Sequence, residues 1–224
     1  MKFLVISDLH GNLDVLDKLD EQFKNADAVL FAGDFTKFGD ASTGLPALEK
    51  LKSKHDTIFS VIGNCDEPSM LEKIEEADMS VQKTLVNFEG LCFAGSGGGS
   101  KFTGETANER TDEELASDLD IITKQEAAEW NNLIAVMHNP PKDTECDKVA
   151  PTVHVGSPLL KKFIDDYKPL AVITGHIHES AAICKAGNTT VINPGALLEG
   201  KYALMQVEKK DGAWSVTGAE LRQL

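Results

Sequence analysis

The sequence predicts an α/β protein with parallel strands and an antiparallel C-terminal part. In the first half, short apolar runs alternate with segments of helical periodicity, which is typical of βαβ units and a parallel sheet. Towards the C-terminus, Gly187-Asn188 and Asp211-Gly212 each separate two apolar runs, and such dipeptides favour hairpin turns. Because single α/β domains commonly reach about 200–250 residues, one domain is expected over residues 1–224.

The elements follow from the apolar pattern in chain order. Strands are predicted in the apolar runs at residues 2–7, 28–34, 57–64, 91–95, 133–139 and 169–176. Helices are predicted at residues 12–23, 45–54, 111–130 and 157–167. The first helix has a stripe formed by Leu13, Leu16, Leu19 and Phe23, and the third has Thr111 as its N-cap. The glycine-rich segment at residues 95–105 fits either a plain surface loop or a lid over a substrate.

Composition excludes several classes of function. The net charge of −14 makes a long nucleic acid a poor partner, because an acidic surface repels its phosphates. A small phosphate ester remains compatible, since bound cations reverse the field locally. No apolar run approaches the roughly 18 residues of a membrane span, and Asp8 comes too early for a signal peptide. The four cysteines, without a CxxC pair, indicate a reducing compartment, and we expect the cytoplasm.

Polar side chains that can bind metals follow the ends of the predicted strands. These residues are Asp8, His10, Asp34, Asn64, His138, His176 and His178. Each alone fits an ordinary strand-end cap, but the carboxyl ends of parallel strands converge, so we expect one cluster. Imidazole and carboxylate groups bind Mn, Fe, Zn and Ni, and the set exceeds the needs of one ion. Asp34 is the natural bridge between two ions, which about 3.5–4 Å apart form a clamp for displacement at phosphorus.

The order of these motifs resembles the calcineurin-like metallophosphoesterase family. The motifs are DLH, GDF, GNCD, MHN and GHIH, and the resemblance extends from Asp8 to the NPG that starts at Asn193. It is strongest to small prokaryotic phosphoesterases whose last motif is like GHIHES. The resemblance implies a four-layer α/β/β/α sandwich with two divalent metal ions (Mn, Fe, Zn or Ni) and a hydroxide between them that attacks phosphorus.

The resemblance also implies a division of the ligands. One ion takes Asp8, His10, Asp34 and His178, and the other takes Asp34, Asn64, His138 and His176. A homodimer is common among related proteins, so a homodimer is a possible state of this chain.

Four further residues are candidates for catalysis. Asn12 fits either a hydrogen-bond donor to phosphate or the N-cap of the following helix. Asp66 fits either a group that orients a ligand or a turn residue before a proline. At Cys65 many family members have a histidine that is taken to protonate the leaving oxygen, and a thiol is a weak donor. His154 could replace that acid, although an inert exposed histidine is the simpler interpretation.

The leading function is that of an enzyme, a metal-dependent hydrolase of a small phosphomonoester or phosphodiester. The alternative is a non-catalytic metal-binding scaffold, since the same fold occurs in a retromer subunit that acts as a binding module. Fold alone does not separate the two. The complete set of metal ligands favours the enzyme.

Overall fold

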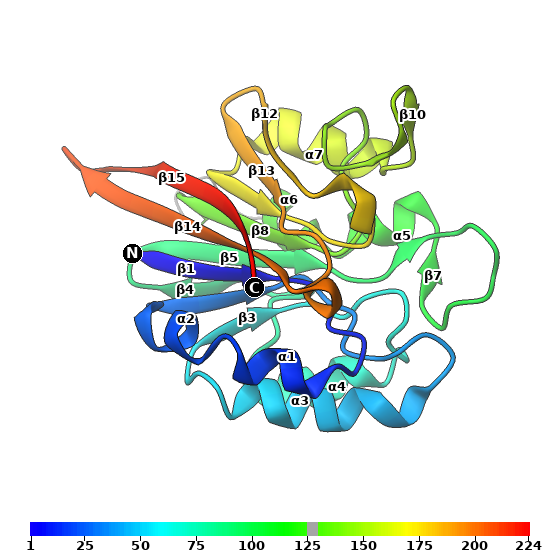
Figure 1. The fold of residues 1–224 in the computed structure, drawn as a ribbon. Helices are drawn as coiled ribbons and strands as arrows, with labels where there is room; N and C mark the ends of the chain where they lie inside the picture. Colours follow the sequence, from blue (N-terminus) through cyan, green and yellow to red (C-terminus); the bar gives the residue numbers. More distant parts are fainter. Residues whose placement is uncertain (125–129) are drawn as a thin grey trace.

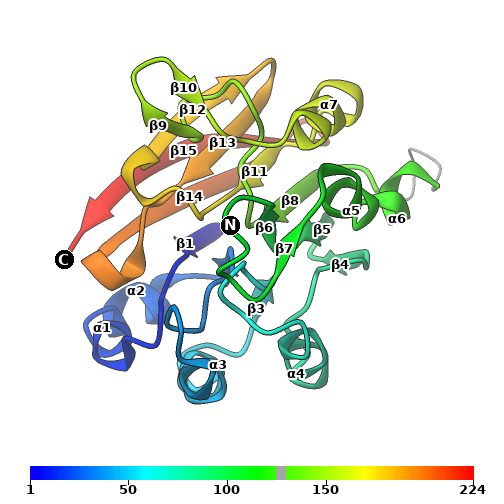
Figure 2. The ribbon, with the colours of Figure 1, turned by 90° about the vertical axis from the view of Figure 1, so that its right-hand side faces the viewer.

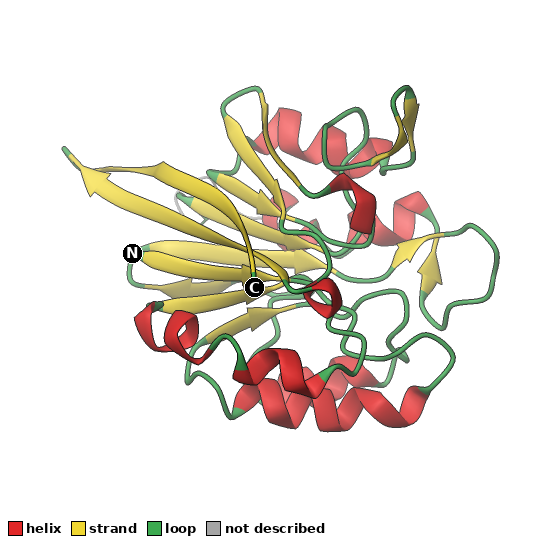
Figure 3. Ribbon diagram, in the orientation of Figure 1, coloured by secondary structure: helices red, strands yellow, loops and turns green. Residues whose placement is uncertain are grey.

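The computed structural model describes residues 1–124 and 130–224, and it has the mixed α/β fold that the sequence predicts. Two larger sheets form the centre of the molecule, with helices on their outer sides (Figures 1 and 3). Within the described residues, no helix has the length and apolar character needed to cross a membrane.

The first sheet has the strand order β15-β14-β1-β2-β3. Its strands are β1 (Lys2–Ile6), β2 (Ala28–Phe31), β3 (Ile58–Ser60), β14 (Lys201–Lys210) and β15 (Ala213–Gln223). β1, β2 and β3 are parallel, whereas β14 pairs antiparallel with both β1 and β15. The predicted hairpin at Asp211-Gly212 is confirmed, and its long strands extend the sheet beyond β1.

The second sheet has the order β12-β13-β11-β8-β5-β4. Its strands are β4 (Val86–Phe88), β5 (Leu91–Ser96), β8 (Leu133–Met137), β11 (Ala171–Ile173), β12 (Ala182–Ala186) and β13 (Thr189–Asn193). β5, β8, β11 and β13 are parallel, and the predicted hairpin between β12 and β13 is confirmed. Two small pairs complete the strands: β6 (Gly99–Ser100) with β7 (Glu109–Arg110), and β9 (Lys148–Ala150) with β10 (Val153–His154).

The helices form two groups on opposite sides of the sheets (Figure 2). The first group is α1 (Leu13–Asp17), α2 (Asp20–Asn25), α3 (Gly44–Lys52) and α4 (Met70–Glu76). The second is α5 (Asp112–Ser117), α6 (Asp120–Thr123) and α7 (Pro158–Tyr167). Short 3₁₀ turns lie at η1 (Ala41–Thr43), η2 (His178–Ser180) and η3 (Leu197–Glu199).

Two predicted helices are shorter than expected. The single helix over residues 12–23 is wrong, because the chain forms α1 and α2 with a tight turn at residues 18–19 between them. There the backbone N–H groups bond three residues back, from Lys18 to Val15 and from Leu19 to Leu16. The helix predicted at residues 111–130 likewise divides into α5 and α6, and its residues 125–129 lie outside the described part. Thr111 caps α5 as predicted, in a capping box with Glu114.

Three apolar clusters hold these elements together. One packs the first helix group on the first sheet, with Leu16, Phe23 and Phe31 among its members. A second lies between the sheets, where the rings of Phe59 and Phe93 stack at 4.0 Å. A third packs the second sheet on α6 and α7. Because the two sheets share a core, the carboxyl ends of their parallel strands are held close to each other.

The glycine-rich segment is only partly an exposed loop, which corrects the sequence-based expectation. Residues 95–99 are buried. A Cβ atom at Gly97 would lie 2.1 Å from Oε1 of Gln82, and one at Gly99 would lie 2.9 Å from Cβ of Asn64. These positions therefore need glycine because neighbouring groups pack against the backbone. Residues 101–105 are exposed.

Candidate metal centre

The strand-end residues of both sheets meet in one cluster, as the sequence predicts. Asp8, Asp34 and Asn64 follow β1, β2 and β3 of the first sheet, while His138 and His176 follow β8 and β11 of the second. Groups of potential ligand atoms within 4.8 Å of one another are Asp8, His10 and His178; His10, Asp34 and Cys65; and Asp8, Asp34 and His138. The groups overlap, so they form one continuous centre.

Hydrogen bonds at the far side of each ring fix the orientation of two histidines. His10 Nδ1 lies 3.0 Å from the carbonyl oxygen of Thr36, and His138 Nδ1 lies 2.6 Å from that of Ala32. A carbonyl oxygen only accepts, so Nδ1 must carry the proton in both rings. In the neutral ring, Nε2 is then left with an unprotonated lone pair that faces the cluster.

These lone pairs face other acceptors at short distances. His10 Nε2 lies 3.6 Å from Asp34 Oδ2 and 3.8 Å from Asp8 Oδ1. His138 Nε2 lies 2.8 Å from Asn64 Oδ1 and 3.6 Å from Asp34 Oδ2. Acceptors repel one another at such distances unless a proton or a metal cation lies between them. The arrangement therefore fits divalent cations, which nitrogen and oxygen donors of this kind bind.

Burial keeps two of the histidines, His138 and His176, in the neutral form that binds metals. Burial lowers the pKa of His138, and burial together with His138 lowers the pKa of His176 to about 3. Both rings are therefore neutral at pH 7. Burial and neighbouring carboxylates raise the pKa of Asp34 well above its ordinary value. An anionic Asp34 is unfavourable here without a positive partner, and a bound cation would supply one.

Several of the candidate ligands have a strained backbone. Asp8, His10, Asp34 and His176 have φ values of 56°, 47°, 61° and 68°. Such left-handed conformations cost roughly 1–3 kcal/mol each in residues other than glycine, and they concentrate at functional sites. Close approach of the backbone adds to the constraint, because a Cβ atom at Gly63 would lie 1.9 Å from Asp34 Oδ1. The fold thus holds these side chains in place at a cost in stability.

Asp66 is fully buried and holds the loop that carries Asp34. Its Oδ2 accepts hydrogen bonds from the backbone N–H groups of Gly63, Asp34 and Phe35 at 2.7, 3.0 and 3.3 Å. Its Oδ1 accepts a fourth from Thr36 at 2.8 Å. The carboxylate therefore acts on the cluster through the backbone, which agrees with an orienting role.

A cavity of about 560 Å³ opens over the cluster. Asn12 and Cys65 line it together with predicted ligands. The side chain of Asn12 makes no N-cap bond; its amide donates to the carbonyl of Leu198 at 3.4 Å. Burial and the nearby Asp34 raise the pKa of the Cys65 thiol, so this group stays protonated at neutral pH.

His154 lies apart from this lining. It is on β10, and its Nδ1 bonds the buried carboxylate of Asp147 at 2.7 Å. The structure therefore brings Asn12 and Cys65 to the cavity and leaves His154 on the small β9–β10 pair.

Sequence reasoning missed some residues of the cavity wall, namely Lys37, Phe38, Thr106 and Leu198. Three of them come from loops and Leu198 from the short 3₁₀ turn η3, where the side-chain pattern gives no periodic signal. A weak signal was available for Phe38, since an aromatic residue three positions after the GDF motif is unusual for a polar loop. It also missed Asn108, which donates to the carbonyl of Gly63 and ties the 101–108 loop to the cluster.

Comparison with known proteins places the chain in a family. Residues 1–180 match the model of the calcineurin-like phosphoesterases. The protein belongs to the calcineurin-like phosphoesterase family. This family consists of phosphoesterases that use divalent metals, and the chain has Asp and His clusters able to bind a metal. The resemblance seen in the motifs is thereby confirmed.

Individual relatives agree with the family. An uncharacterized protein of Methanocaldococcus jannaschii is 35% identical over 201 residues, which cover 87% of this chain and 88% of the relative. The structure is similar to TT1561 of Thermus thermophilus, with a TM-score of 0.71, 20% identity and coverage of 91% and 93%. It is also similar to a dimetal phosphatase from Danio rerio, with a TM-score of 0.63, 13% identity and 92% of each chain covered. At these identities the two structures show the shared fold.

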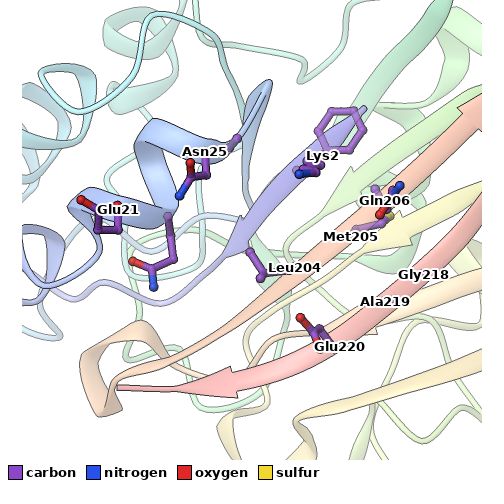
Figure 4. A pocket seen from close by; sticks show the side chains of 12 residues that line it. Lys2, Glu21, Asn25, Leu204, Met205, Gln206, Gly218, Ala219 and Glu220 are labelled. Atoms are coloured by element: carbon purple, nitrogen blue, oxygen red, sulfur yellow. The ribbon is translucent and has the colours of Figure 1, made fainter.

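A second cavity, of about 570 Å³, lies between α2, β1 and the β14–β15 hairpin (Figure 4). Glu21 and Asn25 of α2 face Lys2 and Leu204 of the sheet across it. The described residues that line it include no histidine or cysteine. The first cavity, in contrast, is lined by His10, Asp34 and His178, which belong to groups able to hold a metal ion.

Proposed function

We propose that the protein hydrolyses a phosphomonoester or phosphodiester with the help of two divalent cations. The observation that supports this most directly is the convergence of unprotonated acceptors. Nε2 of His10 and of His138 both lie 3.6 Å from the same oxygen of Asp34. A shared carboxylate oxygen between two imidazole lone pairs is the geometry expected of a bridging ligand.

The contacts support the division of ligands that the family resemblance implies. On one side of Asp34, His10 and His178 approach each other at 3.3 Å, and His178 Nε2 lies 3.3 Å from Asp8 Oδ1. On the other side, His138 contacts Asn64, and the ring of His176 lies 5.2 Å from that of His138. We therefore propose one cation position in each group.

The residues of the chain then have separate tasks. Two bound cations supply a water-derived nucleophile at neutral pH and offset the charge that develops on the phosphate. Asn12 has only a long hydrogen bond to Leu198, at 3.4 Å, so its amide can turn to donate to a phosphate oxygen. Cys65 lines the cavity with a protonated thiol, from which it can donate weakly to the leaving oxygen.

The cluster argues against a scaffold that binds no metal. Left-handed backbone at Asp8, His10, Asp34 and His176 lowers stability, and such strain concentrates at functional sites. Both this strain and the close approach of the ligand atoms are useful when cations occupy the centre. A scaffold that binds metals would share these features, so hydrolysis is the measurement that separates it from an enzyme.

The test is hydrolysis by the metal-reconstituted protein, with phosphomonoesters and phosphodiesters compared across Mn, Ni, Zn and Mg. His138→Ala and His176→Ala should each lower kcat/KM by more than about 100-fold, since even outer partners of metal ligands commonly contribute 10- to 100-fold. His55→Ala is the matched control, because this ring bonds backbone groups of Thr57 and Ala26 and is not among the residues that line the cavity. If the fully metal-loaded protein hydrolyses no phosphoester, the scaffold function is favoured.

The remaining parts of the proposal concern metal and partners. His, Asp and Asn ligands suit Mn, Fe, Zn and Ni, and elemental analysis after expression in metal-supplemented medium would identify the preferred ion. The net charge of −14 supports a small substrate over a long nucleic acid. A homodimer and a cytoplasmic location stay predictions, which sedimentation and cell fractionation would test.

A further inference from the structure

A groove continues from the metal centre along the surface. It has a volume of about 360 Å³ and lies between the loops at residues 36–41 and 104–107. Lys37, Phe38, Cys65 and Thr106 line both this groove and the cavity over the cluster. The two spaces are therefore neighbours, with these four residues at their common boundary.

Both walls of the groove are ordered by specific hydrogen bonds. In the first wall, the backbone N–H of Lys37 donates to Thr43 Oγ1 at 2.8 Å, and that of Asp40 donates to the carbonyl of Lys37 at 2.9 Å. Phe38 lies within this tight turn, with 57% of its surface exposed. A large apolar side chain in a fixed turn beside a polar centre is a contact surface for a ligand.

The second wall is organised around the carboxylate of Glu109. It accepts hydrogen bonds from the backbone of Phe102 at 2.7 Å and of Gly104 at 2.9 Å, and from the hydroxyl of Thr106 at 3.3 Å. The backbone N–H of Asn108 donates to the carbonyl of Asn64 at 2.9 Å, which ties this wall to the metal centre. The width of the groove is thus set by the same structure that positions the cluster.

Charge changes along the groove. Lys37 lies where the groove meets the cluster, and the far part is lined by the acidic residues Asp40, Glu67 and Glu105. A phosphate at the metals is therefore next to a cation, whereas a second anionic group further along would face three carboxylates. This distribution of charge is unfavourable for a second anionic group and compatible with an uncharged one.

We propose that this groove binds the alcohol part of the substrate, an uncharged group of aromatic or nucleoside character that packs on Phe38, while Lys37 contacts the phosphate. This inference rests on the proposed function, because it takes the phosphate to be bound at the cluster. The volume of the groove is within the range of about 300–1,000 Å³ found for small-molecule sites. A flat apolar group gains the most binding energy from this wall, because flat apolar groups pack well on an aromatic ring such as that of Phe38.

The experiment measures binding of phosphonates to the Mn-loaded protein by calorimetry. Phosphonates lack the P–O–C bond, so binding is measured whether or not the protein is an enzyme. Phenylphosphonate should bind about 5- to 15-fold more tightly than methylphosphonate, as expected of an aromatic contact. In Phe38→Ala this ratio should fall to about 1–2.

Phe102→Ala is the matched control, since this phenylalanine belongs to the loop of the second wall but is 93% exposed and is not among the residues that line the groove. It should keep the phenyl preference of the wild type. A second comparison tests charge: 4-carboxyphenylphosphonate should bind more weakly than phenylphosphonate, and a Glu67→Gln, Glu105→Gln double variant should remove most of that difference.

The outcomes separate this inference from the proposed function. If Phe38→Ala keeps the full phenyl preference, or the carboxylate on the ligand makes no difference, the groove is not the site of the alcohol group, even when hydrolysis is observed. If phosphoesters are not hydrolysed but the phenyl preference depends on Phe38, the groove assignment stands and the enzymatic function fails.

Discussion

Asp66→Asn is the substitution that best separates stability from metal binding. The carboxylate is fully buried and accepts four backbone hydrogen bonds, from Gly63, Asp34, Phe35 and Thr36. An asparagine oxygen can replace only one of the two carboxylate oxygens. If the asparagine oxygen occupies the position of Oδ2, which accepts the first three bonds, the NH₂ group occupies the position of Oδ1. The NH₂ group then faces the backbone N–H of Thr36, and two donors point at each other.

The size of the effect follows from these contacts. Loss of a hydrogen bond to a charged group costs about 1.5–3 kcal/mol, and a buried donor without an acceptor costs about 1–3 kcal/mol more. The free energy of unfolding should therefore fall by roughly 3–5 kcal/mol. For a chain of this size, 1 kcal/mol shifts Tm by about 2–4 °C, so the Tm of the metal-free protein should fall by roughly 6–20 °C.

Metal affinity should fall as well, by about 10- to 100-fold, as for other outer partners of metal ligands. The loop that carries Asp34 loses its anchor, and a negative charge that attracts cations is removed. The assay pairs thermal unfolding in chelator with calorimetric titration of Mn²⁺ at a temperature where the variant is folded.

Asp147→Asn is the matched control for this experiment. Asp147 is also fully buried and accepts backbone bonds from Asp143, Thr144 and Gly156 at 2.9–3.1 Å, but it lies in the loop that pairs with His154. It should lose comparable stability and keep its Mn²⁺ affinity. Equal loss of affinity in both variants, or unchanged affinity in Asp66→Asn, would refute the positioning role.

Three other predictions concern the cluster itself. Asp34→Asn should remove both metals, which elemental analysis would show, and retention of either metal would argue against a bridging role. The same substitution should raise the Tm of the metal-free protein, because an amide donor would face the lone pairs of His10 and His138. Cys65→His should increase hydrolysis of alkyl diesters by about 10²–10⁴-fold and change nitrophenyl diesters little, since only a poor leaving group needs a proton; equal effects on kcat/KM for both would contradict an acid role. The pKa of His176 falls from 6.5 to about 3 on folding, so between these pH values the unfolded chain binds a proton that the folded chain does not. The free energy of unfolding without metal should therefore fall as pH is lowered through this interval. Measured by urea unfolding at several pH values, it should depend less steeply on pH in His176→Gln than in the wild type. An equal pH dependence in both proteins would mean that other groups cause the loss of stability.

Much of the fold and of the cluster could be predicted from local sequence. The parallel strands and the C-terminal hairpins have clear patterns of period and turn residues, and Asp8, Asp34 and His138 follow strands directly. Convergence at strand ends is a property of parallel sheets in general, so the sequence alone was enough to group the residues that follow strands of the same sheet. The prediction that the apolar stripe from Leu16 to Phe23 faces the core was also correct, although the predicted helix divides in two.

The rest depended on contacts between segments distant in the sequence. Only the packed structure shows that the cluster joins two sheets, because their pairing is set by the shared core around Phe59 and Phe93. The four bonds of Asp66, the place of His154 on a separate strand pair, and the groove beside Phe38 are likewise fixed by loops. Loop conformation depends on which distant backbone groups need hydrogen-bond partners, and no periodic pattern in the sequence records that.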